Sequence, residues 1–144
     1  MIKILFICHG NICRSTTAQM IMSYLTSCHN IKAQIDSCAT SREEIGCSIY
    51  PDSAAVLREH KIPIIPHRAR QMTLKDAEEY DWLVGMDHNN IRNMKRMLPE
   101  RYHNKIRMLN DHPIEDPWYS GSFEKVYQQI YAGCEKLLDE LISK

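Results

Sequence analysis

The sequence has no excess of either charge, no long apolar segment and no internal repeat. Lysine plus arginine and aspartate plus glutamate number 18 each among the 144 residues, so no overall field attracts nucleic acid or a membrane surface. The apolar run at residues 2–8 is far shorter than the ~20 residues that cross a bilayer. It leads into His-Gly-Asn, whereas a signal peptide ends in small residues at its cleavage site. We therefore expect a cytoplasmic protein that binds neither nucleic acid nor membrane.

Linkers and low-complexity segments are also missing. The length is typical of one domain, and 44% hydrophobic with 25% charged residues is an ordinary globular composition. We expect a single domain over residues 1–144 and a monomer.

Cysteines with the spacing of a metal site are absent as well. Cys8 and Cys13 have no matching second pair of cysteine or histidine ligands of the kind that binds zinc. The chain is not a small, core-poor secreted scaffold, so we expect its thiols to be reduced. We predict no metal and no cofactor. The six cysteines lie at positions 8, 13, 28, 38, 47 and 134.

Strand and helix patterns alternate along the chain. Four short apolar segments predict buried strands at residues 2–8, 33–37, 82–86 and 105–109. Helical patterns separate or follow them, at residues 18–25, 51–60, from 73, 91–98 and from 122. Residues 110–121 are expected to be a polar loop. This alternation predicts an α/β fold: a single-domain, four-stranded parallel sheet with helices on both faces, doubly wound as in flavodoxin.

Three segments of this predicted fold follow the carboxyl ends of strands, where ligands gather in open parallel sheets. They are the loop after Cys8, the turn near Asp87 and the loop after Leu109. We expect them to converge on one edge of the sheet.

The loop after the first strand carries a candidate nucleophile. Cys8 lies between a buried strand and a helix N-terminus, where backbone N–H groups stabilise both a thiolate and a bound phosphate. Gly10 and Asn11 suit a tight loop with positive φ. Arg14 is placed to fold back over the loop and bind two phosphate oxygens. Ser15 can cap the helix or donate to the thiolate. The loop reads Cys8-His-Gly-Asn-Ile-Cys-Arg-Ser15.

A proton donor is needed if a thiolate is to take phosphate from an oxygen leaving group. Asp116 precedes Pro117, which holds the backbone of Asp116 extended. An ordinary Asp-Pro turn explains this dipeptide equally well. Its place after the fourth strand makes Asp116 a candidate general acid.

Taken together, these segments resemble the low-molecular-weight protein tyrosine phosphatases over essentially the whole chain. The shared motifs are the Cys8–Ser15 loop, Asp36-Ser-Cys-Ala-Thr-Ser41, His67-Arg-Ala-Arg-Gln71, Met86-Asp-His-Asn-Asn90 and Asp116-Pro-Trp118.

The resemblance implies a hydrolase that acts on phosphotyrosine proteins or small aryl phosphates through a phosphocysteine intermediate. It assigns Cys8 as nucleophile, Arg14 as phosphate ligand and Asp116 as general acid. Close placement of Cys8 and Cys13 in such loops also suggests a reversible, protective disulfide under peroxide. The residues implied to bind phosphate or support the loop are His9, Gly10, Asn11, Ile12, Cys13, Ser15, Ser37 and His67.

The sequence departs from the family pattern at three positions. Thr16 and Gln19 replace the usual proline and glutamate, with small consequences expected because both lie on the helix. Glu43 stands where the family usually has an aromatic wall of the substrate slot, so ring stacking is lost and acidic phosphopeptides are repelled, with Arg42 offsetting part of that charge. This predicts weak binding of phosphotyrosyl peptides with the chemistry intact. Trp118 and Tyr119 are candidates for the other wall.

Three other functions share parts of this pattern. A thioredoxin-coupled arsenate reductase has the same loop, but it needs two further cysteines, and residues 85–97 contain none. A cysteine phosphocarrier of the sugar-phosphotransferase type needs neither Arg14 nor Asp116. A phosphate-binding module without turnover remains a third possibility.

Overall fold

The computed structural model describes residues 1–143 and contains one sheet. All strand pairs are parallel, in the order β2-β1-β3-β4. This confirms the predicted four-stranded parallel fold. The strands are β1 (Ile2–Cys8), β2 (Ala33–Ala39), β3 (Trp82–Gly85) and β4 (Ile106–Met108).

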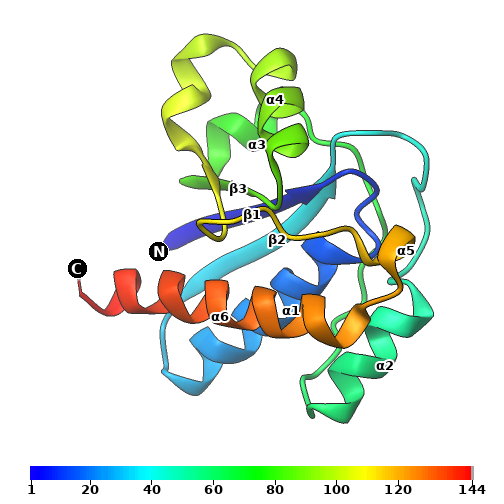
Figure 1. Cartoon of the computed structure of the whole chain (residues 1–144). Helices are drawn as coiled ribbons and strands as arrows, with labels where there is room; N and C mark the ends of the chain where they lie inside the picture. The colour runs from blue at the N-terminus through cyan, green and yellow to red at the C-terminus, as the bar shows by residue number, and fades with distance from the viewer. Residues whose placement is uncertain (144) are drawn as a thin grey trace.

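Helices cover both faces of the sheet (Figure 1). On one face, α1 and α6 pack with α2 against Ile4 and Phe6. On the other, α3 and α4 lie over Leu5 and Ile7. The central strand β1 is therefore buried from both sides, as its continuous apolar sequence predicts. The helices are α1 (Arg14–Cys28), α2 (Pro51–Glu59), α3 (Leu74–Glu79), α4 (His88–Met97), the 3₁₀ turn η1 (Glu100–Lys105), α5 (Pro117–Ser120) and α6 (Phe123–Ile142).

The register of the sheet brings the carboxyl ends of its strands to one edge. Cys8 is paired with Ala39 of β2, and Ile7 with Gly85 of β3. The loop after Cys8 therefore begins beside the turn that contains Asp87. The amide of Ile114 donates to the carbonyl of Met86, so the segment after β4 reaches the same edge.

The prediction of an uninterrupted loop over residues 110–121 is wrong at α5. Asp116 caps this short helix by accepting from the amide of Trp118, Pro117 occupies its first turn, and Gly121 ends it with φ of 74°. Proline at a helix start and glycine just after its end are the usual signals. Four residues are too few for an apolar periodicity to reveal.

Capping boxes fix the starts of two other helices. Thr73 and Asp76 exchange side-chain and backbone hydrogen bonds at α3, which is where the sequence predicts a helix to begin. Asp87 and Asn90 do the same at α4. Asp87 is thereby held rigidly at the edge of the sheet.

A close approach of α6 to the end of β4 depends on Gly133. A Cβ at this position would lie 2.6 Å from Cγ of Leu109 and closer still to the amide oxygen of Asn110.

In residues 1–143, no helix is both long and apolar enough for a membrane span.

Candidate active site

The sulfur of Cys8 is the centre of the loop over residues 8–15, named the phosphate loop after the ligand that the sequence predicts for it. Cys8 is buried at the end of β1, and the hydroxyl of Ser15 lies 3.0 Å from its sulfur. The side-chain amide of Asn11 donates to that hydroxyl at 2.7 Å, so the hydroxyl hydrogen is left to point at the sulfur. The backbone amide of Asn11 donates to the sulfur as well, at 3.3 Å. Two donors therefore face the sulfur, an arrangement that favours a thiolate.

The remaining amides of the loop provide the anion cradle. Those of Gly10, Ile12 and Cys13 donate to no acceptor within residues 1–143. They lie beside Cys8 at the N-terminus of α1, where the helix dipole also favours negative charge.

Asn11 holds the loop in its unusual shape. Its φ is 62°, a left-handed conformation that asparagine tolerates better than most residues. Its side chain is fully buried and donates to Ser37 at 2.9 Å in β2. Its amide oxygen accepts from Nε2 of His67 at 2.8 Å. Bonds from β2 and from the segment before α3 thus fix the loop after β1.

Gln19 belongs to the same network. Its side-chain oxygen accepts a short hydrogen bond from the hydroxyl of Ser37. Gln19 therefore orients the group that holds Asn11, and the small effect expected of its replacing the usual glutamate stays a prediction.

A second layer of charged groups positions His67. Its Nδ1 lies 3.4 Å from a carboxylate oxygen of Asp36, and Asp36 and Asp76 both bind the guanidinium of Arg70. Burial lowers the pKa of His67, and Arg70 acts in the same direction while Asp36 opposes it. The imidazole is thus tied to the loop on one side and to a salt-bridge cluster on the other.

Arg14 is buried and held along one edge of its guanidinium. One terminal nitrogen donates to Asp87 at 2.6 Å and to the carbonyl of Ile114 at 2.9 Å. Its Nε is buried and has no partner within residues 1–143. An unpaired buried donor is costly, and the edge that carries it is available to an oxyanion. Burial would lower the pKa of Arg14, but Cys8 and Asp87 outweigh it and raise that pKa.

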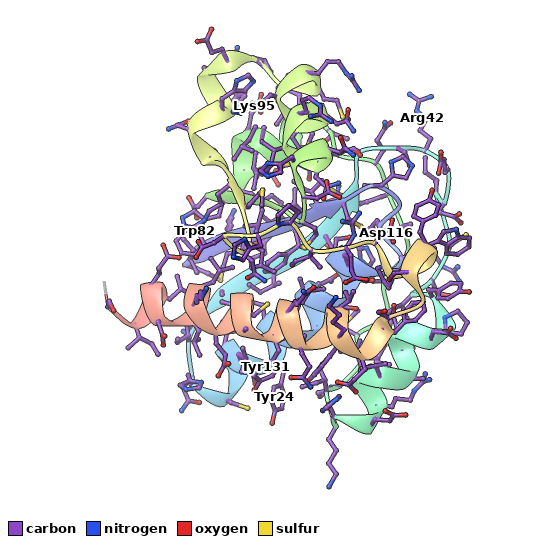
Figure 2. All side chains as sticks on the ribbon, in the orientation of Figure 1. Tyr24, Arg42, Trp82, Lys95, Asp116 and Tyr131 are labelled. Atoms are coloured by element: carbon purple, nitrogen blue, oxygen red, sulfur yellow. The ribbon has the colours of Figure 1, made fainter. Side chains whose placement is uncertain are left out.

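Asp116 lies at the same pocket, within reach of Arg14. One carboxylate oxygen accepts from the amide of Trp118 at 3.0 Å, and the other lies 3.5 Å from a terminal nitrogen of Arg14. Figure 2 shows Asp116 where the segment after β4 enters α5.

The two walls of the pocket differ in chemistry. Trp118 packs edge-on against Tyr50, with ring centroids 5.0 Å apart, and Tyr119 is largely exposed beside it. Another part of the lining is acidic, and there Nε2 of His9 lies 2.9 Å from the carboxylate of Glu43. The side chain of His9 therefore belongs to the wall, while its backbone belongs to the loop. The pocket has a volume of about 150 Å³ and is lined by residues 8–14, Glu43, Glu44, Asp116, Trp118 and Tyr119.

This chain matches the model of one protein family almost from end to end. Residues 3–144 fit the family described as low molecular weight phosphotyrosine protein phosphatase. The chain belongs to this family. A low molecular weight protein-tyrosine-phosphatase of Bacillus subtilis, YfkJ, is 33% identical, with 96% of this chain and 94% of the relative covered. The human low molecular weight phosphotyrosine protein phosphatase is 35% identical over 96% of this chain and 94% of its own.

Solved structures of the low molecular weight phosphatases have the same fold. The enzyme from Streptococcus pyogenes superposes with a TM-score of 0.91 at 35% identity, over 98% of this chain and 93% of that one. YfkJ gives a TM-score of 0.93 at 32% identity, covering 99% and 96%.

Within the phosphatase pocket, Cys13 lies behind the nucleophile. Burial raises the pKa of Cys13 to about 12, and the charge of Cys8 adds to this increase. Cys13 is therefore a neutral thiol close to Cys8.

The structure gathers all the candidate residues of the sequence at this phosphatase site, and it adds two. Asp87 and Gln19 were missed as site residues. The turn near Asp87 was expected at this edge, because the carboxyl ends of parallel strands share it, but no role was predicted for Asp87 itself. No sequence signal pairs Gln19 with Ser37, which is 18 positions away.

Proposed function

We propose that this enzyme hydrolyses phosphotyrosine in proteins, and small aryl phosphates, through a phosphocysteine intermediate. The observation that carries the proposal is the arrangement around Cys8. Donors from Asn11 and Ser15 face its sulfur, and Arg14 has a buried, unpartnered Nε at the same pocket.

In the first step, the substrate phosphate occupies the loop and the Cys8 sulfur attacks phosphorus. Arg14 and the loop amides bind the equatorial oxygens, so the charge of the transition state meets fixed donors. The bond from phosphorus to the phenolic oxygen breaks as the sulfur–phosphorus bond forms. Asp116 donates its proton to the leaving oxygen, which departs as a neutral phenol.

In the second step, water replaces the phenol. Asp116, now a carboxylate, takes a proton from the water as its oxygen attacks phosphorus. The sulfur–phosphorus bond breaks and inorganic phosphate leaves. The hydroxyl of Ser15, 3.0 Å from the sulfur, stabilises the departing thiolate.

The positive charge for both steps comes from Arg14 and the backbone amides. We therefore expect activity that needs no metal and no cofactor and that survives EDTA. We further propose a monomeric cytoplasmic enzyme, in which Cys8 is oxidised reversibly by peroxide.

The two alternative chemistries have less support. An arsenate reductase would need two relay cysteines, and residues 85–97 contain none. A phosphocarrier would have no use for Asp116, which lies 3.5 Å from Arg14 at the pocket.

Steady-state hydrolysis of p-nitrophenyl phosphate and of a phosphotyrosine peptide tests the proposal. Both activities should vanish in Cys8→Ser. In Asp116→Ala, kcat on the phosphotyrosine peptide should fall by about 10²–10⁴-fold, with a smaller loss on p-nitrophenyl phosphate, whose leaving group needs less protonation. Release of one phosphate per enzyme without turnover would instead identify a carrier.

A further inference from the structure

The rim of the pocket carries two glutamates that are fixed across the phosphate loop. The carboxylate of Glu43 accepts no hydrogen bond from the backbone of the loop. It lies 2.9 Å from Nε2 of His9. Glu44 packs its side-chain stem over Gly10, where a Cβ would lie 3.4 Å from Cγ of Glu44. Both glutamates line the pocket.

These glutamates have little counter-charge. Within residues 1–143, Glu44 has no cationic partner, and its one polar side-chain contact is the thiol of Cys47 at 3.5 Å. Within the same residues, Glu43 is paired only with His9. The carboxylates of Glu43 and Glu44 are therefore the charged groups that a ligand meets on this side of the pocket.

The nearby arginines lie outside the pocket lining. Arg42 donates from Nε to Gln71, and its side chain extends outwards from the molecule in Figure 2. Arg68 donates to the carbonyl of Gly46. Neither guanidinium lines the pocket.

Arg14 holds the phosphate group of the substrate, so every substrate carries a negative charge at that group. The glutamates of the rim act on the residues that flank the phosphotyrosine. A peptide chain that carries phosphotyrosine into this pocket passes the carboxylates of Glu43 and Glu44 with its flanking residues. Cationic side chains there are attracted and acidic ones repelled, and exposed charges act in this way over about a Debye length of ~10 Å.

We propose that Glu43 and Glu44 are specificity-determining residues that select phosphotyrosine flanked by lysine or arginine. This inference rests on the proposed phosphatase function and names its substrate class. The aromatic wall of Trp118 and Tyr119 contacts one face of the tyrosine ring. Glu43 and Glu44 interact electrostatically with the residues on either side of the phosphotyrosine.

The test compares three phosphotyrosine peptides of equal length that have lysine, glutamine or glutamate on both sides of the phosphotyrosine. The interaction of two unit charges about 7 Å apart in water changes a rate or equilibrium constant roughly threefold. Exchange of lysine for glutamate should therefore lower kcat/KM about tenfold at low ionic strength, and 0.5 M NaCl should shrink that ratio towards one.

The variants Glu43→Gln and Glu44→Gln should each reduce the lysine-to-glutamate ratio, and the double variant should bring it close to one. Glu78→Gln is the matched control: Glu78 is exposed on α3, outside the pocket, and its loss should leave the ratio unchanged. A wild-type ratio of one or below, or a ratio that both rim variants leave intact, overturns the inference.

Hydrolysis of p-nitrophenyl phosphate separates this inference from the proposed function. If the wild-type enzyme turns over neither this compound nor any peptide, the phosphatase function itself fails. If it turns over all of them without a preference for lysine, only the selectivity fails.

Discussion

The guanidinium of Arg14 is bound to the carboxylate of Asp87 at 2.6 Å, across 73 positions of sequence. Asp87 is at once the N-cap of α4 and the anchor of Arg14. Because the capping box fixes Asp87 to the edge of the sheet, the free edge of the guanidinium is fixed as well. The proposed phosphate site therefore depends on Asp87 through Arg14.

Asp87→Asn should weaken the phosphate site while α4 stays capped, since asparagine is a good N-cap. A charge-assisted hydrogen bond contributes roughly 1.5–3 kcal/mol, so kcat/KM on p-nitrophenyl phosphate should fall at least about tenfold. The inhibition constant of inorganic phosphate should rise in parallel, and loss of the ion pair to the buried Arg14 should lower Tm by several degrees. Unchanged phosphate inhibition would show that Arg14 does not need this anchor.

Gly133→Ala should destabilise the fold. In an unobstructed helix this change stabilises by about 1 kcal/mol. Here the new methyl group meets Leu109 and Asn110, so we expect a loss of about 1–3 kcal/mol and a Tm several degrees lower. Thermal melts give the sign directly, and a higher Tm would contradict the packing described.

Acid should destabilise the wild-type protein more than a His67→Gln variant. Burial lowers the pKa of His67 below its ordinary value of 6.5, so the unfolded chain binds the proton more readily than the native one. The contribution of His67 is complete above about pH 6.5 and is lost as the pH falls through that value towards the lowered pKa.

The measurement is the free energy of unfolding in urea at pH 7.5 and pH 5.5. The loss between these two pH values should be smaller in His67→Gln, whose other histidines are those of the wild type. Equal losses would mean that folding leaves the pKa of His67 unchanged.

Peroxide should inactivate the enzyme reversibly when Cys13 is present. The Cys8 thiolate takes an oxygen from peroxide to form a sulfenic acid, and the Cys13 thiol then displaces water to form the disulfide. Dithiothreitol should restore full activity in the wild type and much less in Cys13→Ser, where Cys8 proceeds to irreversible acids. Equal recovery in both proteins would sink the proposed protection.

Glu43→Tyr should improve hydrolysis of small aryl phosphates. An aromatic wall opposite Trp118 adds ring contacts of about 0.5–1.5 kcal/mol, or roughly two- to tenfold in kcat/KM. Glu43→Gln separates loss of charge from gain of the ring. No gain from tyrosine beyond that of glutamine would show that the ring of the substrate does not reach this wall.

Much of the fold was predictable because its signals are local. The apolar run of β1, the capping pair at Thr73 and the alternation of strands with helices all appear within short stretches of sequence. The short helix α5 was not predicted because one helical turn shows no periodicity. Its N-cap, Asp116, and its C-cap, Gly121, are nevertheless ordinary capping residues.

The features of the site also differ in whether a local sequence signal predicts them. The loop at Cys8 and the Asp116 dipeptide are compact motifs, and both were found. The contacts of Gln19 with Ser37 and of His9 with Glu43 join residues 18 and 34 positions apart. Which side chains meet across such distances is decided by the register of β1 with β2, and no local pattern records it.

The shape of the phosphate loop has a consequence for how this enzyme folds. Asn11 is held by groups 26 and 56 positions further along the chain. The left-handed turn at Asn11 has no such support until β2 and the His67 segment have docked, and these are late, non-local contacts. Catalytic competence should therefore return only with the completed tertiary structure, after secondary structure has recovered. In a refolding chain, Cys8 would therefore be exposed to solvent before the enzyme regains activity.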